Sequence, residues 1–206
     1  MKKLLSGFLG LLLISAGSVN IASASVIDPV HNNGGCCDEL MRGYWFQAPT
    51  DFTIDSLWLN TSNGLSTAYN LEVLKLDTAP PAFPSSTSSY STLASFNDLS
   101  GIVNVNVSFL ANEIIGLLAW DDNLSLTPYS NNIAQNIGGS PITLSRLVRQ
   151  SLTPGGPVSN ENLDTIGAIG FTYNSSNSES VPEPVSLTLF GLGLAGLYGS
   201  RKMKMS

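Results

Sequence analysis

The sequence predicts an all-β protein, folded as an antiparallel β-sandwich of jelly-roll-like type. Short apolar runs of strand length recur between turn residues from Gly43 to Tyr173. Ser, Thr, Asn and Gly are plentiful, and these residues are poor helix formers. Seven or so short strands without a convincing amphipathic helix favour two packed antiparallel sheets.

Each expected strand is an apolar run bounded by turn residues. The predicted strands cover residues 44–46, 52–59, 69–76, 103–109, 113–120, 142–148 and 166–173. The run 103–109 alternates between apolar and polar residues, as a half-buried strand does, and 113–120 is continuously apolar, as a strand buried on both faces is. Only a short turn separates these two, so we expect an antiparallel hairpin. Residues 84–92 are rich in Ser and Thr without apolar periodicity, and we expect a mobile loop there.

Two apolar terminal segments lie outside this domain. Residues 1–24 have the three parts of a signal peptide: Lys2 and Lys3, an apolar run too short for a bilayer of about 30 Å, and small residues up to Ala24. We expect the chain to consist of this signal peptide, a β-sandwich over residues 25–173, a polar linker over 174–181 and an anchor segment over 182–204.

The region between the apolar ends is strongly acidic. Residues 25–180 hold fourteen acidic side chains against four basic ones, a net charge of −10. The four basic residues are Arg42, Lys75, Arg146 and Arg149. Such a charge repels phosphate backbones and excludes nucleic acid as a partner, while it favours solubility outside the cell.

The C-terminal region has the order of a membrane anchor. Val181, Pro182, Glu183 and Pro184 precede a charge-free run over residues 185–200, which reaches roughly 24 Å as a helix and is predicted to cross the membrane with its charged flanks at the interfaces. The basic residues that follow are Arg201, Lys202 and Lys204. The positive-inside rule places them in the cytoplasm and the acidic region outside, which agrees with an N-terminal signal peptide.

This tripartite order resembles the PEP-CTERM sorting signal of exported bacterial proteins; an ordinary membrane anchor is the alternative. The resemblance implies a transiently anchored protein that the secretion machinery exports across the inner membrane. It further implies that an exosortase-type enzyme cuts near the Pro-Glu-Pro sequence and releases the protein to the cell surface or extracellular matrix of a biofilm.

Glycines in the anchor also spell a nucleotide-binding pattern. Gly191, Gly193 and Gly196 have the spacing of the dinucleotide fingerprint, but the strand and crossover helix that this motif requires are missing from its surroundings. We expect small residues here to form a face for close helix contact instead.

Few residues in the domain are candidates for chemistry. His31 is the only histidine and has no partner nearby in sequence, so we expect a solvated loop residue. Cys36 and Cys37 are adjacent, and export leaves three states open: a vicinal disulfide, bridges to another chain, or free thiols. Asp121 and Asp122 offer part of a Ca²⁺ site, although such residues also form turns.

Tryptophans supply the remaining candidates. Trp45, Trp58 and Trp120 are candidates for a sugar-stacking platform, and core packing is the alternative for residues in predicted strands. No nucleophile elbow is present, and His, Lys and Arg are scarce, so we expect no enzyme and no cofactor. The predicted function is a non-enzymatic surface or matrix protein that contacts exopolysaccharide. A secreted polysaccharide hydrolase and a self-associating matrix subunit are the alternatives.

Overall fold

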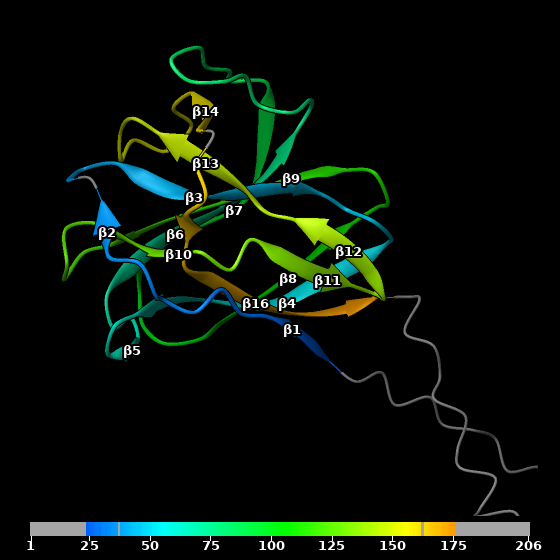
Figure 1. Ribbon diagram of the computed structural model, residues 1–206, viewed down its shortest axis with the longest axis horizontal. Coiled ribbons are helices and arrows are strands. Elements are labelled where there is room, and N and C mark those ends of the chain that lie inside the picture. The colour runs from blue at the N-terminus through cyan, green and yellow to red at the C-terminus, as the bar shows by residue number, and fades with distance from the viewer. Residues whose placement is uncertain (1–23, 37, 162, 176–206) are drawn as a thin grey trace, which may run out of the picture.

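The computed structural model describes residues 24–36, 38–161 and 163–175, which form sixteen strands and no helix (Figure 1). Every ladder between these strands is antiparallel. The prediction of an all-β, antiparallel protein is therefore confirmed.

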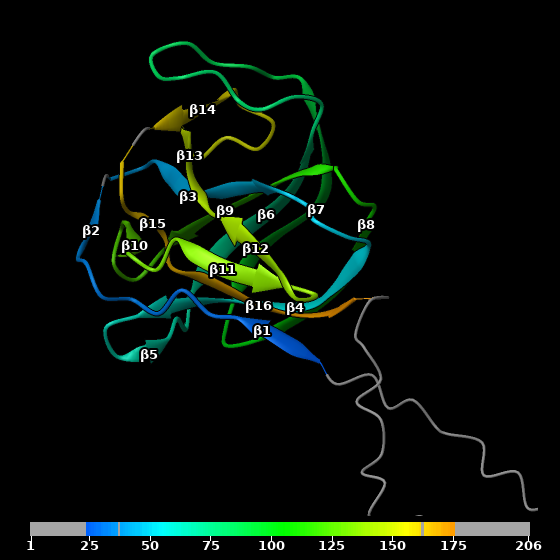
Figure 2. The ribbon, with the colours of Figure 1, turned by 45° about the vertical axis from the view of Figure 1, so that its right-hand side comes forward.

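Two large sheets face each other and curl around a shared core. The six-stranded sheet has the order β14 (Val158–Glu161), β13 (Ser145–Arg149), β3 (Met41–Gln47), β9 (Ile114–Asp121), β6 (Tyr69–Leu76) and β7 (Tyr90–Leu99). The five-stranded sheet has the order β1 (Ser25–Ile27), β16 (Ile169–Ser175), β4 (Phe52–Thr61) and β5 (Gly64–Leu65), with β8 (Val103–Phe109) also paired to β4. The edge strands β7 and β8 lie next to each other, as Figure 2 shows.

The two curled sheets form a half-barrel, and smaller sheets cover its open sides. The hairpin of β11 (Ala134–Ile137) and β12 (Ser140–Thr143) lies across one side, where Ile137 joins the core (Figure 2). At one end, β10 (Thr127–Ser130) pairs with both β15 (Ile166–Gly167) and β2 (Gly35–Cys36). The curvature and these caps remove most of the shared core from water.

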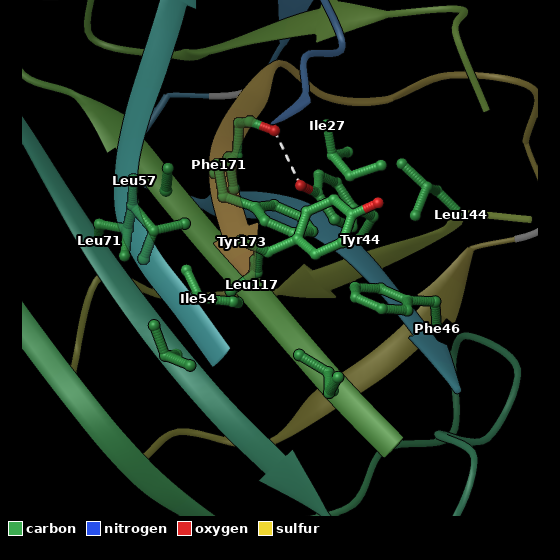
Figure 3. Packing of buried hydrophobic residues seen from close by; sticks show 14 of the residues in the cluster. Ile27, Tyr44, Phe46, Ile54, Leu57, Leu71, Leu117, Leu144, Phe171 and Tyr173 are labelled. Atoms are coloured by element: carbon green, nitrogen blue, oxygen red, sulfur yellow. Dashed lines mark hydrogen bonds between the residues drawn. The ribbon is translucent and has the colours of Figure 1, made fainter. Parts of the chain in front are cut away.

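Aromatic side chains from both sheets fill the space between them. Phe46 from the six-stranded sheet stacks on Phe171 from the five-stranded sheet, with ring centroids 6.2 Å apart (Figure 3). The Tyr44 hydroxyl donates a hydrogen bond to the carbonyl oxygen of Ile169 at 2.8 Å. This bond joins the sheets directly through an otherwise apolar core.

The central strands of the six-stranded sheet, β13, β3, β9 and β6, are buried on both faces. Along β9, Ile115 and Leu117 point into the shared core, whereas Leu118 and Trp120 belong to a second apolar cluster on the outer face. Segments 77–89 and 150–157 cover that outer face, and the bridge between Thr87 and Val158 joins the first of them to β14. The expectation of a fully buried strand at 113–120 is confirmed, as is the half-buried alternation of β8.

The predicted hairpin between residues 103–109 and 113–120 is wrong. Strand β8 pairs with β4 in one sheet, whereas β9 pairs with β3 and β6 in the other. The connecting turn crosses between the sheets beside the turn from β3 to β4, which does the same. The Ala48 amide donates to the Glu113 carbonyl oxygen, and the Asn112 amide donates to the Ala48 carbonyl oxygen, both at 2.8 Å. These two hydrogen bonds hold the two crossings together. The apolar strand β9 buries more of its surface in the six-stranded sheet, which is covered on both faces, than it would beside the half-polar strand β8.

The loop expected at residues 84–92 is shorter than predicted: residues 84–89 connect β6 to β7, whereas residues 90–92 belong to β7. Thr87 bridges to Val158, and β7 begins at Tyr90. The sequence conceals β7 because its apolar residues Leu93, Phe96 and Leu99 are three apart, and the strand pairs with β6 through two bulges that shift its register. At the other end, β16 runs to Ser175, so residues 174 and 175 of the expected linker belong to the strand.

We predict that Tyr44→Phe lowers the free energy of unfolding by about 1–3 kcal/mol, because it leaves the buried carbonyl of Ile169 without this donor. Burial, together with the charge of Asp28, raises the pKa of Tyr44 well above its ordinary value, so the phenol is the donor at neutral pH. Tyr69→Phe is the control: the hydroxyl of Tyr69 donates to the carbonyl oxygen of Gly101, a half-buried turn residue, so a smaller loss is expected. Urea unfolding measures both variants, and equal losses would contradict a cross-sheet role for Tyr44.

We predict that Glu113→Gln lowers the unfolding temperature at pH 7 by roughly 2–4 °C. Hydrogen bonds from the Lys75 ammonium and the Leu110 amide lower the pKa of Glu113 below its usual 4.5. A lowered pKa stabilises the fold above pH 4.5, and the contribution disappears as the pH falls through the folded-state value. We therefore expect the unfolding temperatures of the unaltered protein and the variant to converge as the pH is lowered from 7 to roughly 3. A difference that stays constant with pH would refute this.

Candidate functional site

A pocket of about 260 Å³ opens on the outer face of the six-stranded sheet, where β6 and β7 meet the segment 150–157. Four strands, β3, β6, β7 and β9, supply its walls together with this segment. The lining residues are Met41, Asn70, Leu71, Glu72, Ser95, Phe96, Asn97, Trp120, Leu152 and Pro154.

An ion pair forms the base of this pocket. Glu72, in the middle of β6, is 2% exposed, and Arg149, at the end of β13, is 0% exposed. One carboxylate oxygen of Glu72, Oε1, accepts a hydrogen bond from Nη1 of Arg149 at 2.7 Å. Removing both charges from water is costly, so the two groups hold each other in place.

Arg149 also fixes the wall of the pocket. Its Nε donates to the Gly156 carbonyl oxygen at 3.0 Å, and its Nη2 donates to the Tyr90 hydroxyl at 3.1 Å. Tyr90 in turn donates to the same Gly156 oxygen at 2.7 Å. The segment that carries Leu152 and Pro154 is thereby fastened to the sheet.

The second oxygen of Glu72 has no partner. Its Oε2 is buried without a hydrogen bond in the described structure, and the residue lines the pocket. A buried carboxylate oxygen without a donor is costly, and a ligand that supplies a donor would remove this cost. This orphaned acceptor is the clearest chemical feature of the pocket.

The remaining lining combines polar and apolar groups. Ser95, opposite Glu72 in the register of β7, and Asn97 are exposed and supply hydroxyl and amide groups. The amide of Asn70 is fixed by hydrogen bonds to both carboxylate oxygens of Asp122, each 2.9 Å long. Trp120, Leu152 and Pro154 provide apolar surface. Carboxylate, amides and an indole together suit a small ligand with hydroxyl groups and an apolar face.

A second pocket, of about 390 Å³, lies at the far end of β3. The lining residues are Trp45, Phe46, Gln47, Ala48, Pro49, Asn112, Pro141, Ile142, Thr143 and Ser145. No charged side chain is among them. Glu72 is the one carboxylate that lines either of these two pockets, so neither presents the pair of carboxylates that glycoside hydrolysis requires.

The predicted tryptophan platform does not form. Trp58 is 6% exposed, on the other sheet, where its ring lies against Gly170 and its Nε1 donates to Asp28 at 3.2 Å. Trp120 is 4% exposed and contributes only to the first pocket. Trp45 is half-buried and lines the second pocket. The three side chains are separated because strand alternation and sheet membership send them to different surfaces.

Asp121 and Asp122 form a turn. The Asp121 carboxylate accepts the amide of Leu124 at 2.8 Å, and Asp122 binds Asn70. Among the described residues, no group of three or more His, Cys, Asp or Glu side chains lies close enough to hold a metal ion. His31 lies in a loop, where its Nε2 and the Gly34 carbonyl oxygen are 2.7 Å apart.

Other predicted site residues lie partly or wholly outside the described residues. Cys36 is disulfide-bonded, but Cys37 is not described, so pairing between these neighbours stays a prediction. The sorting motif, the glycines of the expected helix and the terminal basic residues are likewise not described. These are Val181, Pro182, Glu183, Pro184, Gly191, Gly193, Gly196, Arg201, Lys202 and Lys204. Within the part of the chain that the structure covers, no helix is long and apolar enough to cross a membrane.

Neither Glu72 nor Arg149 is among the site residues predicted from the sequence. The signal available was a single carboxylate inside the apolar run 69–76, on the same strand face as Leu74 and Leu76. An acid at such a position needs a buried partner. The identity of that partner, 77 residues away, depends on how β13 and β6 are placed in one sheet.

We predict that Arg149→Met lowers the free energy of unfolding by about 3–5 kcal/mol, because the Glu72 carboxylate is left buried and unpaired. The double variant Arg149→Met, Glu72→Met is expected to recover most of this loss. Lys75→Met is the control, since it removes a half-exposed side chain from its ion pair with Glu113 and should cost less than about 1 kcal/mol. Chemical denaturation measures all three, and additive losses in the double variant would contradict the coupling.

Comparison with known proteins bears on the C-terminal segment. No curated protein and no solved structure matches the chain. Residues 180–202 match the family described as the PEP-CTERM protein-sorting motif. The matched range contains the Val-Pro-Glu-Pro sequence, the charge-free run and the first two terminal basic residues. The protein therefore carries a PEP-CTERM sorting motif, which marks it for export and for membrane-associated sorting to the cell surface by an exosortase-type enzyme.

Proposed function

We propose that this exported, sorted protein is a non-enzymatic surface or matrix module that contacts exopolysaccharide through the pocket above Glu72. The observation that carries the proposal is the buried Oε2 of Glu72, which lacks a donor and lines a pocket with Trp120. Sugars combine hydroxyl donors with apolar ring faces, and these match the two kinds of surface that the pocket offers.

The placement of the ends supports a display role. Strand β1 pairs with the last part of β16, with Ser25 opposite Tyr173, so both ends of the described domain leave from the five-stranded sheet (Figure 1). The pocket lies on the outer face of the six-stranded sheet. A tether at the end of β16 is attached to the five-stranded sheet. The pocket, on the outer face of the six-stranded sheet, therefore points away from the tether.

The facing antiparallel sheets and the turns that cross between them support a jelly-roll-like sandwich as the description of this domain. A non-enzymatic role is supported by the single carboxylate of the pocket, already paired with Arg149. A hydrolase would need a second carboxylate near the first.

We predict that the full chain, purified in detergent, is retained on immobilised exopolysaccharide. The double variant Ser95→Ala, Asn97→Ala removes polar groups at the pocket mouth and is expected to reduce retention at least fivefold. Both positions are exposed, so the fold should be unaffected.

Asn104→Ala is the matched control, because Asn104 is an exposed strand residue on the other sheet. Circular dichroism confirms that each variant is folded. Failure of the unaltered protein to bind any neutral or acidic polysaccharide would overturn the proposed function.

A further inference from the structure

We infer that the pocket above Glu72 takes a single sugar unit that donates hydrogen bonds and carries no negative charge, so that uronic acids are rejected. This inference rests on the proposed function and specifies its ligand. It follows from the donors, charges and dimensions of the lining residues.

The chemistry of Glu72 decides which group can approach. Its carboxylate is paired with Arg149, and an ionised carboxylate only accepts hydrogen bonds. The vacant position at Oε2 is therefore complementary to a hydroxyl, amide or ammonium group. A ligand carboxylate at this position would bring two acceptors of like charge together.

The cation beneath the pocket is not available to balance a ligand anion. Arg149 directs its guanidinium to the Gly156 carbonyl, the Met41 sulfur, Glu72 and the Tyr90 hydroxyl. No Lys or Arg is among the lining residues, and residues 25–180 carry a net charge of −10. An anionic sugar would lose its hydration without gaining a counter-charge.

The dimensions limit the ligand to one ring. About 260 Å³ lies just below the roughly 300–1,000 Å³ of pockets that enclose drug-sized ligands. Trp120, Leu152 and Pro154 supply an apolar wall, and Ser95 and Asn97 supply polar groups. The apolar face of a pyranose can pack on that wall while its hydroxyls reach Glu72.

Isothermal titration of the full chain with three monosaccharides tests the inference. We expect methyl glucopyranoside and glucosamine to bind at least tenfold more tightly than glucuronate at the same pH and ionic strength. Because Glu72→Gln alters a buried pair and could unfold the protein, the principal variant is Asn97→Lys, which places a cation at the exposed mouth of the pocket.

Asn97→Lys is expected to raise the affinity for glucuronate, relative to the affinity for methyl glucopyranoside, at least tenfold. Asn104→Lys, with the same charge change on the other sheet, should leave all three affinities unchanged. Equal or tighter binding of glucuronate by the unaltered protein would overturn the charge selection. Retention on polysaccharide without binding of any monosaccharide would overturn the pocket as the site and leave only exopolysaccharide contact through another surface; loss of retention as well would overturn the proposed function altogether.

Discussion

The buried ion pair between Glu72 and Arg149 is the constraint on which the outer half of this protein depends. Such a pair contributes little net stability, because both charges lose their hydration, but breaking it is severely unfavourable. Arg149 lies on β13 and Glu72 on β6, with two strands between them in the sheet. The pair therefore fixes the relative position of strands that do not touch, and through Gly156 and Tyr90 it fixes the covering segments as well.

Burial on both faces explains why the six-stranded sheet carries the site. A sheet that packs on one side leaves its other face to water, whereas here the segments 77–89 and 150–157 cover the outer face and enclose a second apolar cluster. The pocket forms where this cover is incomplete, beside Trp120. A polar acceptor at the base of an otherwise apolar layer is then shielded from bulk water, which raises the cost of leaving it without a hydrogen-bond donor.

Local pattern predicted the burial of several strands well and their limits and pairing poorly: the run 142–148 is divided between β12 and β13, which belong to different sheets. The alternation in β8 and the continuous apolar run of β9 led to the correct burial of each, because side-chain period reflects how many faces are covered. The same pattern predicted a hairpin that is not formed, since the short turn between them crosses from one sheet to the other and is held by Ala48. Strand β7 was concealed because an edge strand with bulges needs no apolar alternation.

The sequence by itself determined the all-β antiparallel class, the acidic exported domain and the sorting motif, because composition, strand period and a short linear signal are properties of neighbouring residues. Only the tertiary structure decided that Trp45, Trp58 and Trp120 lie apart, and that Glu72 meets Arg149 beneath a pocket. The physical reason is that a binding site depends on which strands share a sheet and which face is covered. Those relations join residues 77 positions apart, as in the ion pair, and leave no local trace in the chain.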